Sequence, residues 1–171
     1  MFMFSALLIP VTEAPKNTKE VDLAAAFEAY CDMVYRLAFI RTGNVADAED
    51  ILSEVFLRLV KNKNKIDGDE HLKNWLIRVT INCSNTLFKR LKRRGEVELT
   101  ENCGFDVIKE DMVLPAVLSL PENQKIIVYM YYYEGYSVEE IAGILGIPSG
   151  TVKSRLARAR DKLKIKLSNE F

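Results

Sequence analysis

Apolar side chains recur at intervals of three and four residues along most of the chain, which is the period of an amphipathic α-helix. The clearest case is segment 47–60, DAEDILSEVFLRLV, which has one wide apolar face. That face consists of Ala48, Ile51, Leu52, Val55, Phe56, Leu59 and Val60. No stretch alternates apolar and polar residues consistently enough to indicate a β-strand. The pattern therefore predicts an all-α protein.

Capping and turn residues divide the N-terminal half into three predicted helices. The first covers residues 20–42 and stops at Gly43, a residue type that is common after helix C-termini. Asn44 can cap the second helix, whose acidic first turn suits the positive end of the helix dipole. The loop KNKNKIDGDE breaks the pattern, and a third helix is expected from about Leu72 to Arg93.

The C-terminal half predicts three or four shorter helices. Pro121 suits the first position of one of them, PENQKIIVYMYYYEG. The segment SVEE is typical of a capping box that pairs Ser137 with Glu140. After the turn GIPSG, Ser149 can cap the last helix.

A weakly patterned acidic segment, GEVELTENCGFDVIKED, lies between the two halves and is the best candidate for a domain boundary. We therefore expect two small helical domains joined by an acidic linker, the C-terminal one a helix-turn-helix. The expected ranges are an N-terminal extension at 1–19, a first domain at 20–94, the linker at 95–111 and a second domain at 112–171.

The formal net charge is zero, with 24 basic and 24 acidic residues, but the charges are segregated along the chain. Residues 71–94 contain seven Lys or Arg and no acid, and residues 95–122 contain seven acids against one Lys. From residue 151 to the end, seven basic residues stand against two acids. Two positive segments separated by a negative one indicate two contacts with a polyanion.

The last predicted helix separates apolar from basic side chains. One narrow stripe consists of Val152, Leu156, Ala159 and Leu163. About a third of a turn away lies a basic stripe rich in hydroxyl groups. A short helix, a tight turn and a helix with such a face make a helix-turn-helix, whose second helix fits the DNA major groove. The residues expected to contact DNA are Ser149, Thr151, Lys153, Ser154, Arg155, Arg158 and Lys162. The alternative is a solvated basic surface helix.

The third predicted helix carries a continuous polar stripe formed by Arg78, Asn82, Asn85 and Lys89. Asparagine amides hydrogen-bond base edges, and exposed aromatic rings such as that of Phe88 stack on unpaired bases. The alternative is that Phe88 and Trp75 are ordinary core residues. On the second helix, Leu57 faces away from the apolar stripe among charged residues. It would suit docking against another protein, although single exposed apolar residues are common.

Composition argues against several other classes of protein. The three cysteines are far apart and form no CxxC pair or metal cluster with the single histidine, which favours a reduced, intracellular protein. No Gly-rich phosphate loop or nucleophile motif is present, so we expect neither an enzyme nor a cofactor or metal. The apolar start MFMFSALLIP is too short to span a bilayer. A cytoplasmic protein without membrane insertion is expected, with a targeting role for that segment as the alternative.

Three segments together resemble the extracytoplasmic-function (ECF) sigma factors, a two-domain class of bacterial RNA polymerase specificity subunits. DAEDILSEVFLRLV is similar to the family's polymerase-binding helix, and WLIRVTINCSNTLFKRLKRR to its helix for the promoter minus-ten element. The segment LPENQKIIVYMYYYEGYSVEEIAGILGIPSGTVKSRLARARDKLK is similar to its minus-thirty-five domain. The likeness extends from about Phe27 to Lys164.

The resemblance implies functional roles for particular residues. Contacts with core RNA polymerase would fall to Asp47, Glu49, Asp50, Ser53, Glu54 and Leu57. Contacts with the minus-ten element would fall to Arg78, Asn82, Asn85, Phe88 and Lys89. The loop at 61–71 would help to form a pocket for a flipped base. The implied partners are core polymerase, promoter DNA and an anti-sigma factor.

The chain also departs from the family pattern near the minus-ten helix. Thr80 and Ile81 stand where the family often has Ala-Arg before the asparagine, and Asn85 replaces a frequent acid. The architecture implied by the resemblance is unaffected, but the base preference at the minus-ten element is open. The alternative function is a stand-alone helix-turn-helix regulator, which would leave the first domain without a role.

Overall fold

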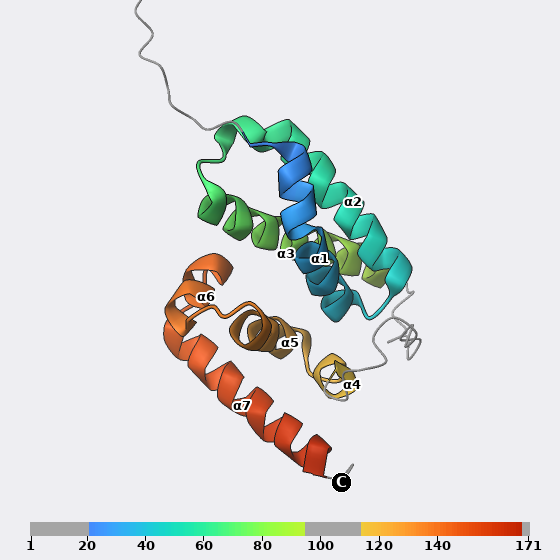
Figure 1. Cartoon of the computed structure of the whole chain (residues 1–171). Coiled ribbons are helices and arrows are strands. Elements are labelled where there is room, and N and C mark those ends of the chain that lie inside the picture. The colour runs from blue at the N-terminus through green and yellow to red at the C-terminus, as the bar shows by residue number, and fades with distance from the viewer. Residues whose placement is uncertain (1–20, 95–113, 169–171) are drawn as a thin grey trace, which may run out of the picture.

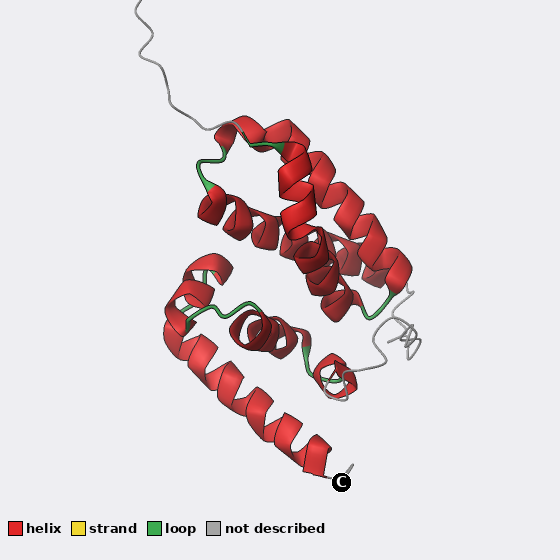
Figure 2. Ribbon diagram, in the orientation of Figure 1, coloured by secondary structure: helices red, strands yellow, loops and turns green. Residues whose placement is uncertain are grey.

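The computed structural model describes residues 21–94 and 114–168. In these two ranges every regular element is a helix, as Figure 2 shows, so the expected all-α fold is confirmed. The expected N-terminal extension at 1–19 and the acidic linker at 95–111 lie outside the described residues.

The first three helices form one bundle (Figure 1). They are α1 (Leu23–Thr42), α2 (Val45–Asn62) and α3 (Asp69–Arg94), with a single 3₁₀ turn, η1 (Lys63–Lys65), after α2. Helix α1 begins later than predicted because the Asp22 carboxylate caps it, accepting from the backbone N–H groups of Ala24 at 2.9 Å and Ala25 at 3.2 Å. Helix α3 begins earlier than predicted, so two acids occupy its first turn and complement the helix dipole.

The connection between α1 and α2 follows the predicted signals. Gly43 adopts a left-handed conformation with φ of 65°, which ends α1, and its N–H donates to Phe39 O. The Asn44 side chain then accepts from Asp47 N at 3.0 Å and caps α2. Most of the predicted apolar face of α2 packs inward, with Ile51, Val55 and Leu59 buried. Val60 is 52% exposed, so the buried face is narrower than the sequence pattern predicts.

The C-terminal half contains α4 (Leu114–Leu118), α5 (Glu122–Val128), a π-helical turn η3 (Tyr129–Tyr133), α6 (Val138–Leu145) and α7 (Ser149–Ser168). The capping box is confirmed, since Glu140 N donates to Ser137 Oγ at 3.2 Å and Ser137 N donates to Glu140 Oε2 at 2.7 Å. Pro121 precedes α5 and is not its first residue.

The prediction that Ser149 caps the last helix is wrong. Ser149 is already helical, and the backbone carbonyl of Pro148 accepts the first bonds of α7, from Thr151 N and Val152 N. The turn before it depends on Gly146, whose φ of 66° lies in the left-handed region that glycine adopts without strain.

The two halves pack against each other (Figure 1). The Tyr129 hydroxyl lies close to α1, 3.3 Å from Met33 O, and donates to Glu134 Oε1 at 2.8 Å. Helix α3 meets α6, where Arg78 Nε donates to Ile144 O at 3.2 Å. Buried residues of both halves form one continuous apolar cluster. The structure therefore holds the helix-turn-helix directly against the polar side of α3.

Candidate functional site

The outer face of α2 is acidic. Its six residues, the set expected to bind polymerase, all lie at least partly exposed: Asp47, Glu49, Asp50, Ser53, Glu54 and Leu57. Leu57 is 57% exposed, which is high for a large apolar side chain. Glu54 accepts from Arg58 Nε at 2.7 Å, one turn further along the helix. Several carboxylates beside an exposed leucine on one helix face suit a partner whose surface has basic and apolar side chains.

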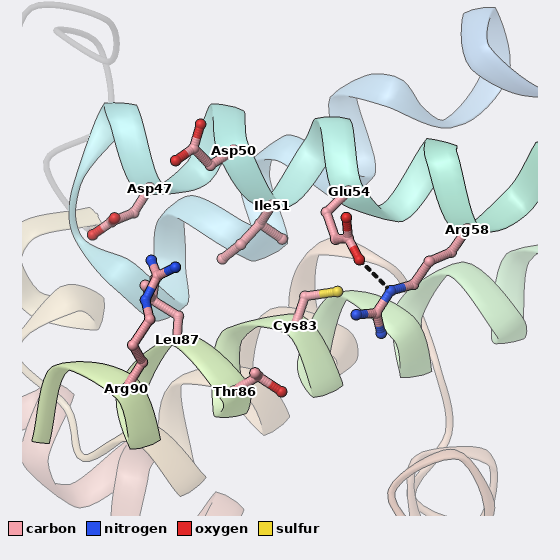
Figure 3. Close-up of a pocket in the computed structure, with 9 residues that line it drawn as sticks. All are labelled: Asp47, Asp50, Ile51, Glu54, Arg58, Cys83, Thr86, Leu87 and Arg90. Atoms are coloured by element: carbon pink, nitrogen blue, oxygen red, sulfur yellow. Dashed lines mark hydrogen bonds and ion pairs between the residues drawn. The ribbon is translucent and has the colours of Figure 1, made fainter. Parts of the chain in front are cut away.

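A groove of ≈ 300 Å³ runs between α2 and α3 beside this face (Figure 3). It is lined by Asp47, Asp50, Ile51, Glu54, Arg58, Cys83, Thr86, Leu87 and Arg90. Cys83 belongs to the side of α3 that packs inward. Burial raises the pKa of its thiol, and the charge of Glu54 raises it further, while Arg58 opposes the shift. The thiol is therefore neutral and unsuited to nucleophilic chemistry.

The polar stripe of α3 is exposed, but two of its members are engaged within the protein. The Arg78 guanidinium donates to two backbone carbonyls of α6, Ile144 O and Gly143 O, from Nε at 3.2 Å and Nη2 at 3.1 Å. The Asn85 amide oxygen accepts from Arg41 Nη2 at 2.7 Å. Asn82 and Lys89 are exposed on the same face of α3. The four residues thus share one face of α3, as the sequence pattern predicts. Arg78 and Asn85 are hydrogen-bonded within the protein, whereas Asn82 and Lys89 are exposed.

The two aromatic residues considered on α3 are both half-buried. Trp75 packs against the apolar cluster, in agreement with the alternative that it is a core residue. Phe88 lies under the Arg41 guanidinium, whose carbon is 5.6 Å from the ring centroid. That separation is typical of a cation–π contact.

Arg41 is a residue near this site that the sequence pattern did not single out. It is 6% exposed in the last turn of α1, where a basic side chain is ordinarily explained by the helix dipole. Burial lowers the pKa of its guanidinium, and the negative charge of Glu122 partly opposes this. No local sequence signal links Arg41 to Asn85, because the two are separated by 44 residues.

Helix α7 has the two faces that its sequence predicts. Val152, Leu156 and Ala159 are buried, and Leu163 is partly buried. The predicted DNA-contact residues fall into two groups by exposure. Exposed are Lys153, Ser154, Arg158 and Lys162, and half-buried are Ser149, Thr151 and Arg155. The arrangement leaves a basic face with hydroxyl groups exposed, and this face could enter the major groove of DNA.

Arg160 of α7 was not predicted as a site residue. Its Nε donates to the Tyr132 hydroxyl at 2.7 Å, and its guanidinium lies 5.6 Å from the centroid of Tyr131. The two tyrosines belong to the π-helical turn η3, which directs them toward α7. Arg160 is thus held by aromatic side chains on the side of α7 away from Arg158, which is two residues earlier.

The loop between α2 and α3 begins with the 3₁₀ turn η1 and has one buried residue. Ile66 is buried, and Asp67 N donates to His71 Nδ1 at 3.1 Å. Most other side chains of this loop are exposed, including that of Lys65, and Lys61 is exposed in the last turn of α2. This composition would suit an unpaired, negatively charged DNA strand.

Residues 21–94 and 114–168 contain no candidate membrane span and no candidate metal cluster. No helix there combines the length and apolar character needed to cross a bilayer. No three His, Cys, Asp or Glu side chains in these ranges are grouped so that they could hold a metal ion.

Comparison with protein families gives two matches. The Sigma-70 region 2 model matches residues 26–94, and the Sigma-70 region 4 model matches residues 111–163. These ranges include the acidic face of α2, the polar stripe of α3 and the helix-turn-helix. Because region 2 accounts for the N-terminal half, a stand-alone helix-turn-helix regulator is not favoured.

Individual relatives and solved structures agree. The ECF RNA polymerase sigma factor SigW of Bacillus subtilis is 31% identical, covering 89% of this chain and 94% of its own. The ECF RNA polymerase sigma-E factor of Escherichia coli is 28% identical over 71% of this chain and 74% of its own. The solved sigma factor RpoE of Bartonella quintana, in complex with the anti-sigma factor NepR, shares the fold with a TM-score of 0.67 at 20% identity, covering 86% of this chain and 97% of that one. CnrH, solved with the cytosolic domain of CnrY, gives a TM-score of 0.65 at 21% identity, covering 87% and 89%.

An acidic helix face with an exposed leucine, a basic polar helix and a helix-turn-helix thus occur together in a chain that matches the Sigma-70 region 2 and region 4 models. The chain belongs to the ECF sigma factors, which direct RNA polymerase to promoters for transcription initiation.

Proposed function

We propose that three surfaces of this sigma factor divide the work of initiation among them. The outer face of α2 binds core RNA polymerase, the polar side of α3 binds the minus-ten element, and the basic face of α7 binds the minus-thirty-five element. The observation that carries this division is the separation of charge. Figure 1 places acidic α2 and basic α7 on opposite sides of the molecule.

The polymerase-binding role rests on the six exposed residues of α2. Complementary charge speeds association and fixes the orientation of a partner, while a desolvated apolar contact adds affinity. Asp50 and Glu54 supply the charge, and Leu57 supplies the apolar contact. The groove beside them offers room for a side chain of the polymerase.

The minus-ten role rests on α3 and the loop that precedes it. Unpaired bases are held by stacking and by hydrogen bonds to their edges, which offset the free energy of unstacking. Asn82 supplies an exposed amide, Phe88 an aromatic ring and Lys89 a positive charge. The segment 61–71, which spans the end of α2, the turn η1 and the start of α3, would border the pocket for a flipped base.

The minus-thirty-five role rests on α7. Arg155 and Arg158 are spaced to reach base edges within one major groove, while Lys153 and Lys162 suit phosphate contacts. Val152 and Leu156 attach the opposite face of α7 to the rest of the domain.

The contact between Arg78 and α6 bears on regulation. With Nε and Nη2 bonded to Ile144 O and Gly143 O, much of the Arg78 guanidinium is engaged within the protein and is turned toward α6. Binding at the minus-ten element would then require α3 and α6 to separate. We propose that an anti-sigma factor controls this chain, because the structurally similar sigma factor RpoE of Bartonella quintana was solved in complex with the anti-sigma factor NepR. A partner that favours the packed arrangement would keep the sigma factor inactive.

The proposed sigma factor works by binding alone. It performs no covalent chemistry of its own, needs no cofactor and acts in the cytoplasm, where bacterial core polymerase and promoter DNA are found. The two helical domains are proposed to act at 20–94 and 112–171, with 95–111 as the connection between their sites on the polymerase.

Reconstitution tests the proposed function. Transcripts that appear when the protein is overproduced would be mapped to their start sites, and the corresponding promoters transcribed with purified core polymerase. Adding this protein should produce initiation at the mapped starts, and omitting it should abolish that signal. Initiation that does not depend on the protein would contradict the proposal.

A further inference from the structure

Arg41 connects a buried cation to two residues proposed for the minus-ten element. Its Nη2 donates to Asn85 Oδ1 at 2.7 Å, and its guanidinium carbon lies 5.6 Å from the Phe88 ring centroid. Both partners belong to α3, whereas Arg41 ends α1. One side chain beneath the helix surface therefore contacts two residues proposed to touch DNA.

This contact is not explained by stability alone. Arg41 is only 6% exposed, and its Nε has no hydrogen-bond partner among the described residues. Burying a cation with an unsatisfied donor is unfavourable, and well-packed apolar replacements of such groups are often neutral or stabilising. The nearby carboxylate of Glu122 also has a buried oxygen, Oε2, without a partner in the described part of the chain. The arrangement thus holds a buried guanidinium, with one donor unsatisfied, against both Asn85 and Phe88.

The chemistry of the two groups dictates how Asn85 is oriented. A guanidinium has five N–H donors and no acceptor, so the Asn85 amide must present its oxygen to Arg41. The amide nitrogen, with its two N–H donors, then points away from Arg41. Asn85 is exposed overall, so those donors are accessible at the surface of α3.

Asparagine reads adenine through a bidentate contact in which its oxygen accepts from N6 while its nitrogen donates to N7. In Asn85 the oxygen already accepts a strong, charge-assisted bond. Where the amide meets the exocyclic group of a base, an outward nitrogen suits a carbonyl, O4 of thymine or O6 of guanine, and opposes the amino group of adenine or cytosine.

We propose that Arg41 is a positioning residue for minus-ten recognition. It holds Asn85 so that the amide donates to a keto base, thymine or guanine, at one position, and it fixes the Phe88 ring for stacking on an unpaired base. This inference rests on the proposed function of α3 as the minus-ten surface.

The test uses the holoenzyme formed with core polymerase and a promoter library randomised across the minus-ten element. Sequencing the transcribed templates gives the base preference at each position. The parent should prefer keto over amino bases at one position, and Asn85→Ala should abolish that preference. Arg41→Met, which keeps an unbranched buried side chain but removes the donors, should reduce the preference about fivefold, the value of one hydrogen bond. Arg41→Lys, which keeps a donor, should restore part of it.

A second variant covers the case in which Arg41→Met does not fold. Asn85→Asp keeps an acceptor for Arg41 but has no outward donor, so it should remain folded and lose the keto preference. Retention of that preference by Asn85→Asp would overturn the inference.

The failures of the inference and of the proposed function are distinguishable. If Asn85→Ala leaves every position unchanged, α3 does not read DNA through Asn85 and the proposed function fails there. If Asn85→Ala removes a preference that folded Arg41→Met retains in full, Asn85 reads DNA without help from Arg41, and the inference alone is overturned.

Discussion

Arg78 of α3 binds the carbonyl oxygen of Ile144, near the C-terminal end of α6, with a distance of 3.2 Å between Nε and O. The last carbonyls of a helix lack intrahelical partners and carry partial negative charge, so a guanidinium there is favourable. The turn of the helix-turn-helix begins just beyond, at Gly146. The side chain proposed to bind the minus-ten element thus holds the domain proposed to bind the minus-thirty-five element.

Removing this contact should loosen the packing of the two halves. The double variant Lys73→Ala with Arg78→Ala also removes the ion pair between Lys73 Nζ and Glu134 Oε2 at 3.0 Å. We expect a larger radius of gyration in small-angle X-ray scattering than for the parent. Lys89→Ala with Arg90→Ala, which removes the same charge from the same helix, is the control and should scatter like the parent. Equal scattering by both double variants would show that these bonds do not hold the halves together.

Two serines near α6 and α7 should differ in their effect on stability. Ser137 caps α6 through its hydroxyl, whereas Ser149 is already inside α7 and its place as a cap is taken by the Pro148 carbonyl. Ser137→Ala should lower the free energy of unfolding by about 1 kcal/mol, and Ser149→Ala should change it by less than about 0.5 kcal/mol. Urea denaturation measures both. A larger loss for Ser149→Ala would restore the capping role that the sequence suggested.

These serines show what local sequence predicts and what it does not. Asn44, Gly43 and the capping box at 137–140 were predictable because each signal and its backbone partner lie within a few residues. The predicted cap of α7 was wrong because the Ser149 hydroxyl and the Pro148 carbonyl are both acceptors for the first N–H groups of the helix. In the structure, the carbonyl accepts from Thr151 N and Val152 N. The π-helical turn at Tyr129–Tyr133 had no signal in the apolar pattern.

The candidate site, too, was predictable where it depends on local sequence and unpredictable where it depends on tertiary packing. Periodicity predicted which side chains of α2 and α7 face outward, since the face of an isolated helix depends only on spacing. It did not predict the pairing of Arg41 with Asn85 or of Arg78 with Ile144. These partners lie 44 and 66 residues apart, and only tertiary packing brings them together.

Alkaline pH should weaken the contact between α1 and the C-terminal half. Burial raises the pKa of Tyr129 above its ordinary value of 10.0, and the neighbouring charge of Glu134 raises it further. The neutral phenol is therefore favoured in the folded state. Its contribution is complete below the unfolded pKa of about 10 and is lost as pH rises through the higher folded pKa. Stability against urea should fall above pH of about 10, and Tyr129→Phe should reduce that slope. An unchanged slope would assign the pH dependence to other groups.

The basic face of α7 should contain both base-reading and phosphate-binding residues. Replacing Arg155 or Arg158 with Ala should relax preference at one minus-thirty-five position by about 1–3 kcal/mol for at least one of them. Replacing Lys153 or Lys162 should weaken all sequences equally and reduce the salt slope by about one. Binding of promoter variants at several salt concentrations separates the two effects. If all four substitutions leave binding unchanged, the basic face is only a solvated surface.

The central claim is that the acidic outer face of α2 is the surface that binds core polymerase. The most direct measurement is the affinity of core polymerase for a fluorescently labelled double variant, Asp50→Arg with Glu54→Arg, compared with Glu28→Arg, an exposed acid on α1. Thermal unfolding of each variant confirms that the fold is retained. We predict that the double variant loses at least about tenfold in affinity, because charge reversal places like charges against the partner, while Glu28→Arg binds like the parent. A folded double variant that binds core polymerase as tightly as the parent would contradict the account.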